Sequence, residues 1–336
     1  MNMRSLVIGM LLLTSSVAIA QKPKVIASAS IFADMAQTIA GDLAEIKSVV
    51  PIGGDPHRYE PTPGDAKLVQ NADLILINGL TFEGWMQELI ENSGTKGKTI
   101  LITKNIIPIA SDLHAGATDP HAWMTASNGL IYIKNIYEAL SNLLPENKEE
   151  LTKNYNAYKA QLEALDAEIF SLIRSIPEGQ RVLVTSHDAF NYYGSRYGLT
   201  LSAVMGISTE SDAQTADMKR VINNIKEFNV PAIFIESTIN PKLIQQIATD
   251  LKVKIGGELY ADSVGEPGSD GDTYIKMLRH NSKTIAEALS GTNFASTKLN
   301  KDAGYLNSGV IFGIIAFLLF SILYMIFKLD STHAKY

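Results

Sequence analysis

Four residues spread along the 336-residue chain could together hold a metal ion: His57, His121, His187 and Asp262. Two of the histidines stand in the same local motif, Asp-Pro-His. The third directly follows a short apolar run, Val182–Thr185, and the aspartate follows another, Lys254–Tyr260. Three imidazoles and one carboxylate suit a divalent transition metal. Because the four residues are far apart in the chain, the site requires a fold that brings distant segments together.

The predicted positions of these residues support that requirement. A proline before each of the first two histidines stiffens the chain, so that each ring is presented from a rigid turn. His57 follows a predicted strand, Glu45–Pro51, and His187 and Asp262 also follow strands, whereas His121 follows a loop. In open α/β sheets ligands bind beyond the carboxyl ends of the strands. The sequence assigns no role to the other histidines, which are His114, His280 and His333.

The body of the chain alternates short apolar runs with helical patterns, which is typical of parallel sheets flanked by helices. In the first half, strands are predicted at Lys24–Ala29, Glu45–Pro51, Ala72–Asn78 and Thr99–Thr103, and helices at Pro63–Asn71 and Ser127–Leu144. In the second half, strands are predicted at Val182–Thr185, Leu199–Val204, Ala232–Glu236 and Lys254–Tyr260, and helices at Asp188–Tyr197, Thr215–Phe228, Pro241–Leu251 and Asp272–Leu289.

Between the halves, Pro145–Ile176 predicts one long helix, because its apolar residues recur every three or four positions. They are Leu151, Tyr155, Tyr158, Leu162, Leu165, Ile169 and Leu172. The expected fold is therefore α/β, with two lobes (21–144 and 178–290) joined by a rigid helix (145–177). This layout leaves a cleft between the lobes.

Both ends of the chain are apolar. Residues 1–20 have an arginine, an apolar run and an Ala-Ile-Ala exit, as secretory signal peptides do. Residues 306–327 contain no charge, and a helix of that length spans roughly 33 Å, enough for a membrane. The sequence thus predicts an exported protein with a tether (291–305), a transmembrane anchor and a cytoplasmic tail (328–336).

Composition narrows the possible functions. The chain contains no cysteine, which excludes disulfides, thiolate ligands and a lipid attached through cysteine. Its formal net charge of −6 argues against nucleic acid as a partner. The metalloprotease motif H-E-x-x-H and the hydrolase motif G-x-S-x-G are both absent from the sequence.

Several motifs make the chain resemble the metal-binding receptors of bacterial ABC importers. This manganese, zinc and iron group (cluster A-I) includes members first described as adhesins. The motifs are GGDPHRYEPTPGDAKLVQNADLILINGLTFEGW, DPHAW, VLVTSHDAFNYYGSRYG, GISTESDA, IFIEST and YADSVGEPGSDGDTYIKMLRHN, and the likeness runs from about Lys24 to Leu289.

The resemblance implies two α/β lobes, one rigid helix and one metal ion between the lobes. Its four ligand positions fall on His57, His121, His187 and Asp262, which the residues themselves already suggest. It also implies a monomeric receptor that is not an enzyme, and that delivers the ion to a membrane permease driven by a cytoplasmic ATPase.

Two departures from the family pattern matter. Many members carry a lipid on an N-terminal cysteine, and here the C-terminal apolar segment would replace it. Manganese-preferring members often have glutamate where this chain has His187, and a nitrogen-rich set of ligands suits Zn²⁺. Zinc receptors, however, usually carry a long His-rich loop, and Pro108–Thr118 is short. The ion therefore stays open between Zn²⁺ and Mn²⁺, with Fe²⁺ also possible.

Two other functions remain as alternatives. Three histidines and a water molecule form a catalytic zinc site, so a zinc-dependent hydrolase is the first. A surface adhesin is the second. Because metal ligands must be deprotonated, a receptor should lose affinity as its histidines protonate, at pH values near 6.5 and below.

Overall fold

The computed structural model describes residues 21–110, 118–211 and 213–291. The predicted signal peptide, anchor and tail, and nearly all of the tether, lie outside these residues, as do His114 and His333. Within the described ranges, no helix is both long enough and apolar enough to span a bilayer. The described part of the chain folds as one compact unit.

A four-stranded parallel sheet forms the first lobe, with strand order β2-β1-β3-β4. Apolar side chains of β1 and β3 are buried on both faces, as expected for the central strands of a sheet covered by helices. The strands are β1 (Lys24–Ala27), β2 (Glu45–Ser48), β3 (Leu74–Ile77) and β4 (Lys98–Leu101), and the helices are α1 (Ser30–Ala40), α2 (Pro63–Gln70), α3 (Gly84–Ser93) and α4 (Ala126–Leu143).

Helix α3 has no counterpart among the helices predicted from the sequence. It begins at a glycine, and its N-cap residue, Glu83, makes no capping hydrogen bond through its side chain. Only Met86, Leu89 and Ser93 are buried, so the helical periodicity is short. The clearest signal of this helix in the sequence is at its C-terminal end, where Gly94 adopts a left-handed conformation that favours glycine.

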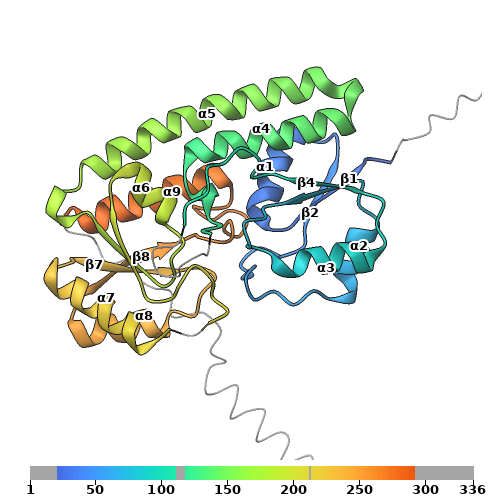
Figure 1. Ribbon diagram of the computed structural model, residues 1–336. Coiled ribbons are helices and arrows are strands. Elements are labelled where there is room, and N and C mark those ends of the chain that lie inside the picture. Colours follow the sequence, from blue (N-terminus) through green and yellow to red (C-terminus); the bar gives the residue numbers. More distant parts are fainter. Residues whose placement is uncertain (1–20, 111–117, 212, 292–336) are drawn as a thin grey trace, which may run out of the picture. The chain divides into compact units, whose positions relative to one another are not determined.

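Helix α5 (Lys148–Arg174) joins the two lobes (Figure 1). It packs against α1 and α4 of the first lobe and against α6 (Asn191–Tyr197) and α9 (Tyr274–Leu289) of the second. The predicted long helix is therefore present, although Pro145–Asn147 forms a separate 3-10 turn. Its buried residues are Leu151, Tyr158, Leu162, Leu165, Ile169 and Ile173, so the predicted Tyr155 and Leu172 lie at the edge of the buried face.

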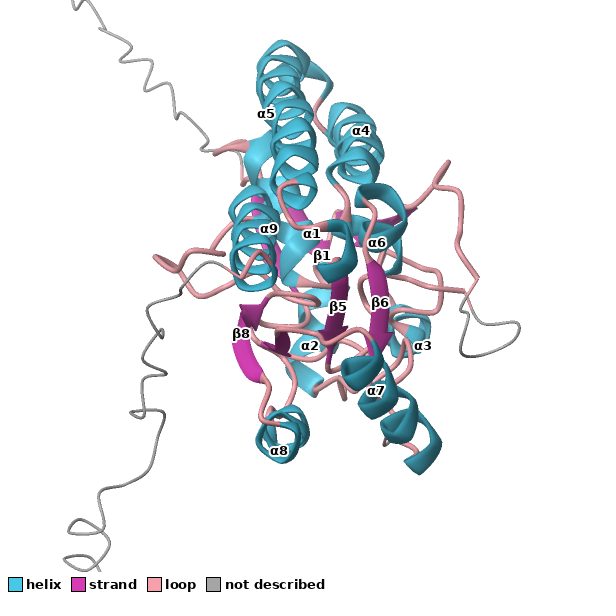
Figure 2. Ribbon diagram, turned by 90° about the vertical axis from the view of Figure 1, so that its left-hand side faces the viewer, coloured by secondary structure: helices cyan, strands magenta, loops and turns pink. Residues whose placement is uncertain are grey.

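The second lobe contains two parallel pairs of strands, β5 with β6 (Figure 2) and β7 with β8. Strand β5 lies beside β7, so all four strands form the core of the lobe. The prediction of parallel strands flanked by helices is confirmed. The strands are β5 (Val182–Thr185), β6 (Thr200–Ala203), β7 (Ala232–Glu236) and β8 (Lys254–Leu259), and the remaining helices are α7 (Thr215–Glu227) and α8 (Lys242–Leu251).

The largest apolar core is continuous between the lobes. Trp123 of the first lobe is fully buried, and its ring N–H donates to the carbonyl of Ala261 in the second lobe at 2.8 Å. Tyr274, at the start of α9, donates its hydroxyl proton to the carbonyl of Trp123. A shared core with cross-lobe hydrogen bonds resists wide separation of the lobes.

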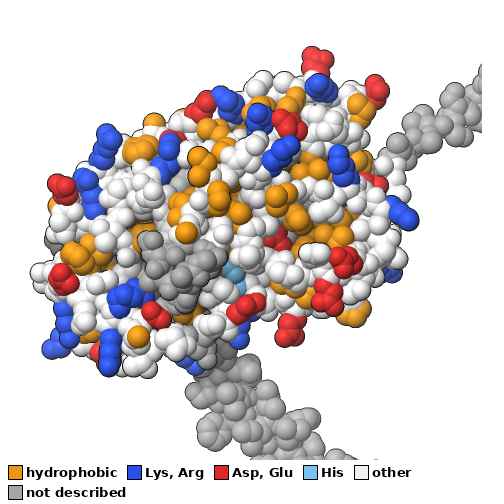
Figure 3. All heavy atoms as spheres, in the orientation of Figure 1, with side chains coloured by type: hydrophobic (Ala, Val, Ile, Leu, Met, Phe, Trp, Pro, Cys, Tyr) orange, Lys and Arg blue, Asp and Glu red, His pale blue; other side chains and the backbone are white. Residues whose placement is uncertain are grey.

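The surface seen in Figure 3 carries lysine, arginine and acidic side chains interspersed, without a broad basic area on that face. Large apolar side chains with high exposure are few among the described residues: Leu101, Ile107 and Phe228. This mixed distribution agrees with the acidic net charge of the chain.

Candidate metal centre

Two rigid turns of the first lobe present His57 and His121. His57 lies in the loop after β2, and its backbone N–H donates to Asp55 Oδ1 at 3.0 Å. His121 directly precedes a 3-10 turn and α4, and its backbone N–H donates to Asp119 Oδ1 at 2.8 Å. In both Asp-Pro-His motifs the aspartate thus closes a local turn around the proline, which holds the histidine in place.

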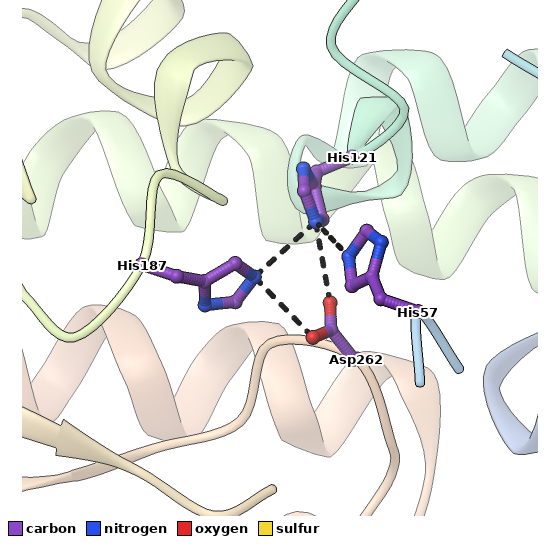
Figure 4. Close-up of side chains that lie close together, drawn as sticks. All are labelled: His57, His121, His187 and Asp262. Atoms are coloured by element: carbon purple, nitrogen blue, oxygen red, sulfur yellow. Dashed lines mark hydrogen bonds and ion pairs between the residues drawn. The ribbon is translucent and has the colours of Figure 1, made fainter. Parts of the chain in front are cut away.

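The second lobe supplies His187 and Asp262 from the ends of two strands. His187 is two residues beyond β5, and Asp262 is three residues beyond β8. The side chains of all four predicted ligands point toward one another (Figure 4). The structure brings the four residues together in one cluster, with two members from each lobe, and their role as ligands stays a prediction.

The ligand atoms are separated by distances that suit one metal ion. His121 Nε2 lies 3.1 Å from His57 Nε2 and 3.3 Å from His187 Nε2. The two oxygens of Asp262 lie 3.4 Å from His121 Nε2 and 3.3 Å from His187 Nε2. Bonds of about 2.0–2.1 Å in a tetrahedral site place the ligand atoms ~3.4 Å apart. In the metal-free protein these contacts are hydrogen bonds and ion pairs, in which protons occupy the space that a metal ion would take.

The burial of the cluster also favours a cation as its occupant. His57 is 6% exposed, and the other three residues are 0–1% exposed. Among the described residues, the ion-pair partners of the Asp262 oxygens are the rings of His121 and His187. A buried carboxylate is costly unless a metal or a charged group compensates it. Both oxygens face the cluster, so a single ion could bind one or both.

Buried carboxylates support two of the histidine rings from behind. Asp119 Oδ1 lies 2.7 Å from His121 Nδ1, and Glu236 Oε2 lies 2.6 Å from His187 Nδ1. Asp119 and Glu236 are 0% and 1% exposed. Histidine ligands commonly donate their second N–H to such a carboxylate, which selects the tautomer that leaves Nε2 free for the metal.

Aromatic rings complete the wall of the site. Phe82 meets His57 edge to face at 5.1 Å between ring centroids, and Trp123 packs against His121 at 5.2 Å. These rings exclude water from one side of the cluster and restrict the orientations of the imidazoles. They also connect the site to the apolar core that the lobes share.

The three histidines have different pKa values because their electrostatic environments differ. Burial lowers the pKa of His57 to about 3. Burial also acts to lower the pKa of His121, but the carboxylates of Asp119 and Asp262 outweigh it and raise the pKa to about 9. At His187 burial is likewise outweighed, here by Glu236 and Asp262, and the pKa lies well above its usual value.

The pKa of Asp262 responds in the opposite direction. Burial acts to raise the pKa of its carboxyl group, but the nearby His187 and His121 hold it well below the usual value. The aspartate is therefore ionised, and the two imidazoles with raised pKa values supply its positive partners in the metal-free protein. A divalent cation would take over that role and displace their protons.

A cavity of about 510 Å³ reaches the site from outside, and His57 is the only predicted ligand that lines it. Its other walls include Thr81, Phe82 and Gly84 of the first lobe and most of Met205–Ser211, the loop that follows β6. Thr209 of this loop donates a hydrogen bond to Asp55 Oδ2 at 2.6 Å, across the boundary between the lobes.

Sequence reasoning did not assign roles to Glu236 or Thr209. Glu236 is the last residue of β7, and β7 lies beside β5, which leads to His187. The rule that ligands bind beyond the carboxyl ends of parallel strands could therefore have identified it. Thr209 lies in a loop, where no periodic pattern marks a contact. Of the histidines without an assigned role, His280 lies on α9, with its Nε2 3.0 Å from the carbonyl of Glu258.

Comparison with known proteins identifies the family. The profile of the family described as "Zinc-uptake complex component A periplasmic" matches residues 25–288. The chain belongs to this family. Together with the names of the relatives below, this membership confirms the resemblance to metal-binding receptors of ABC importers that the motifs suggested.

Two relatives of this chain have names that describe metal transport. The manganese ABC transporter substrate-binding lipoprotein PsaA of Streptococcus mitis is 36% identical over 278 residues, which cover 80% of this chain and 90% of that protein. The metal ABC transporter substrate-binding lipoprotein FimA of Streptococcus parasanguinis is 35% identical over 277 residues, with 80% and 90% covered.

Solved structures show the same fold. The periplasmic zinc-binding protein TroA of Treponema pallidum has a TM-score of 0.76 and 36% identity, covering 80% of this chain and 99% of that one. The manganese-bound periplasmic metal-binding protein of Candidatus Liberibacter asiaticus has a TM-score of 0.73 and 32% identity, with 80% and 100% covered.

Proposed function

We propose that this chain is an extracytoplasmic receptor that binds one divalent transition-metal ion and delivers it to the permease of an ABC importer. The ligands are His57, His121, His187 and Asp262. The observation that carries this proposal is their convergence from two lobes into a buried cluster with metal-sized spacing. The permease and its cytoplasmic ATPase are the partners that membership of the family implies.

The donor set accepts either Zn²⁺ or Mn²⁺. Three imidazole nitrogens and one carboxylate suit Zn²⁺, whereas Mn²⁺ prefers more oxygen, which a bidentate Asp262 would partly supply. The affinity of Fe²⁺ for such a set of ligands lies between those of Mn²⁺ and Zn²⁺. Because Zn²⁺ outcompetes Mn²⁺ at a permissive site, binding in vitro does not identify the ion that the protein carries in its cell.

A receptor fits this site better than a hydrolase does. A catalytic zinc ion has three protein ligands and one open position for water, whereas here a fourth residue, Asp262, points into the cluster. With Asp262 bound, the ion has no activated water. Turnover of ester or peptide substrates that depends on added metal would contradict this assignment.

The adhesin alternative makes a different prediction about the metal site. If attachment to host matrix were the main function, a His57→Ala/His187→Ala double variant would keep the biological effect of the wild type. A receptor that feeds an importer loses its effect in that variant. Growth at limiting metal, compared with binding to matrix, separates the two functions.

Stoichiometric metal binding is the direct test of the proposed ligands. We expect purified protein to bind one equivalent of Zn²⁺ or Mn²⁺ and Asp262→Ala to bind far more weakly, by more than the ~10–100-fold that loss of a supporting residue costs. His280→Ala is the matched control, because His280 lies outside the cluster. Equal loss in both variants, or none in Asp262→Ala, would refute the ligand set.

The physiological ion is tested on protein from its own membrane. Elemental analysis of wild-type protein beside His187→Glu should show a larger share of manganese in the variant, since glutamate adds an oxygen ligand. An unchanged metal content would mean that residue 187 does not determine the selection.

We propose that two terminal segments determine where in the cell the receptor is located. Residues 1–20 would direct export, and residues 306–327 would anchor the receptor beside its permease, in place of the lipid implied by the name "lipoprotein" of its relatives. A Gly/Ser-type linker of 15 residues reaches ~20–23 Å, and a tether of that reach would raise the effective concentration at the permease. Deletion of residues 305–336 should release the protein from membranes, and retention would contradict the anchor.

A further inference from the structure

The carboxylate of Glu236 contacts His187 through both of its oxygens. Its Oε1 accepts the backbone N–H of His187 at 2.9 Å, and its Oε2 lies 2.6 Å from Nδ1 of the ring. The two residues are 49 positions apart, so local turn geometry does not create the contact. It exists because β7 ends beside β5, with both carboxyl ends at the same edge.

The same contact at His121 has a local origin. Asp119 also accepts both the backbone N–H and the ring Nδ1 of its histidine, but it lies only two residues away in the Asp-Pro-His turn. At His57 the aspartate of the turn accepts only the backbone N–H and bonds across to Thr209 instead. His187 has no Asp-Pro turn, and Glu236 replaces the missing aspartate from another strand.

The position of Glu236 is costly unless it has a function. The residue is 1% exposed, and among the described residues its only partner in an ion pair is His187. A buried carboxylate with so few donors is unfavourable in an otherwise apolar strand end. Val184 and Ile235 show that apolar side chains fill the neighbouring positions of these strands.

We propose that Glu236 is the positioning residue that makes His187 a metal ligand through Nε2. A carboxylate at Nδ1 requires the proton on that nitrogen, which leaves the lone pair on Nε2. The second contact, from the backbone N–H of His187 to Oε1 of Glu236, holds the carboxylate beside the ring. The ring is thereby oriented so that its Nε2 lies 3.3 Å from His121 Nε2 and 3.3 Å from Asp262 Oδ2. This inference rests on the proposed function.

A double-mutant cycle tests the role. Glu236→Gln should weaken Zn²⁺ binding about 10–100-fold. The same change in a His187→Ala background should have little further effect, because its ring is already gone. Equal losses in both backgrounds would show that Glu236 acts only through general structure, and no loss in a folded variant would overturn the proposal.

A matched control separates positioning from stability. Asp166 on α5 is also an enclosed carboxylate that accepts two hydrogen bonds, from Arg196 Nε and from the hydroxyl of Tyr197, but no hydrogen bond or ion pair joins it to a histidine. We expect Asp166→Asn to leave Zn²⁺ affinity within about twofold of the wild type, a change too small to count as positioning. A loss as large as that of Glu236→Gln would mean that any change to an enclosed carboxylate disturbs the site.

The wild-type protein provides a test that does not depend on the folding of a variant. In ¹⁵N-histidine NMR spectra of the zinc-loaded protein, His187 should carry its proton on Nδ1 and bind the metal through Nε2. Metal on Nδ1 would overturn the proposal. If the wild type bound no Zn²⁺ or Mn²⁺ at all, the proposed function would fail instead, so the two failures are distinguishable.

Discussion

At the scale of single residues, the site is a set of histidines in unequal environments. His57 borders the cavity and has a lowered pKa, whereas His121 and His187 are enclosed and face carboxylates that raise theirs. The sequence predicts loss of affinity near pH 6.5, the ordinary value for histidine. The structure shifts the expected loss of affinity to higher pH, because His121 and His187 are positively charged at neutral pH in the metal-free protein.

We therefore predict that metal affinity rises with pH between 7 and 9. At pH 7 His121, with a pKa of about 9, is protonated in the metal-free protein, and His187 titrates well above its usual value. Each proton that the metal displaces contributes up to ~tenfold per pH unit to affinity. Calorimetry in two buffers of different ionisation enthalpy measures the protons released, and pH-independent affinity over this range would contradict the prediction.

The same raised pKa affects the stability of the metal-free protein. A proton that binds the folded state more tightly than the unfolded state stabilises the fold below the unfolded pKa of 6.5. That contribution is lost as the pH rises through about 9. His57 has the opposite sign: its contribution is present above pH 6.5 and is lost as the pH falls toward 3.

At the scale of elements, the site depends on loops that begin at the ends of strands. The loop Met205–Ser211 leaves β6, lines the cavity beside His57 and crosses to the first lobe through Thr209. Asp55 receives that hydrogen bond and also the backbone N–H of His57. A single carboxylate thus connects a metal-ligand turn to a loop of the other lobe.

Removal of this bond should speed the release of the metal. Thr209→Val keeps the shape of the side chain but removes the donor, and a hydrogen bond to a carboxylate contributes about 1.5–3 kcal/mol. We expect the dissociation rate to rise by about 10–100-fold. Stopped-flow transfer to a chelator measures it. Thr209→Ser should restore the wild-type rate, Ser208→Ala should leave it unchanged, and a wild-type rate in Thr209→Val would exclude the cross-lobe bond as a barrier.

Helix α5 connects the lobes through its buried face. Leu162 is fully buried in the shared core, whereas its neighbour Glu163 is exposed and pairs with Lys159. We expect Leu162→Ala to lower the free energy of unfolding by about 2–5 kcal/mol, because it leaves a cavity. Glu163→Ala should change it by only ~0.5 kcal/mol. Urea denaturation with a chelator present checks both, and equal effects would contradict the assignment of the buried face.

At the scale of the whole molecule, the lobes are held together by more than the connecting helix. The apolar core is continuous between them, and Trp123 and Tyr274 make hydrogen bonds from one lobe to the other. Wide opening would break these contacts and expose apolar area, at a cost of roughly 25 cal/mol per Å². Local movement of loops around the cavity is therefore the cheaper route for the metal.

Removal of the metal should accordingly leave the dimensions of the protein nearly unchanged. We expect the radius of gyration in solution scattering to differ by less than about 1 Å between the metal-loaded and chelated forms. The melting temperature should nevertheless fall, because an ion at 100 times its dissociation constant stabilises the fold by about 2.7 kcal/mol. A large increase in the radius of gyration would show that the lobes open widely.

The sequence alone determined the candidate ligands, the fold class and the long helix. Paired Asp-Pro-His motifs and strand-end positions identify His57, His121, His187 and Asp262, because residue type and strand order are local properties that periodicity reveals. The strands Val182–Thr185 and Ala232–Glu236 have the predicted bounds. Helix α3 escaped prediction because its buried face is too short to give a pattern.

Only the tertiary structure decided which residues support the ligands and how the rings are charged. Glu236 reads as the end of a buried strand, and its contact with His187 arises from the adjacency of β5 and β7. In the sequence Thr209 is one residue of a polar loop, and only the packing of the two lobes places it beside Asp55. A pKa depends on burial and on charges within a few ångströms, and these are set by packing between segments 49 to 154 residues apart.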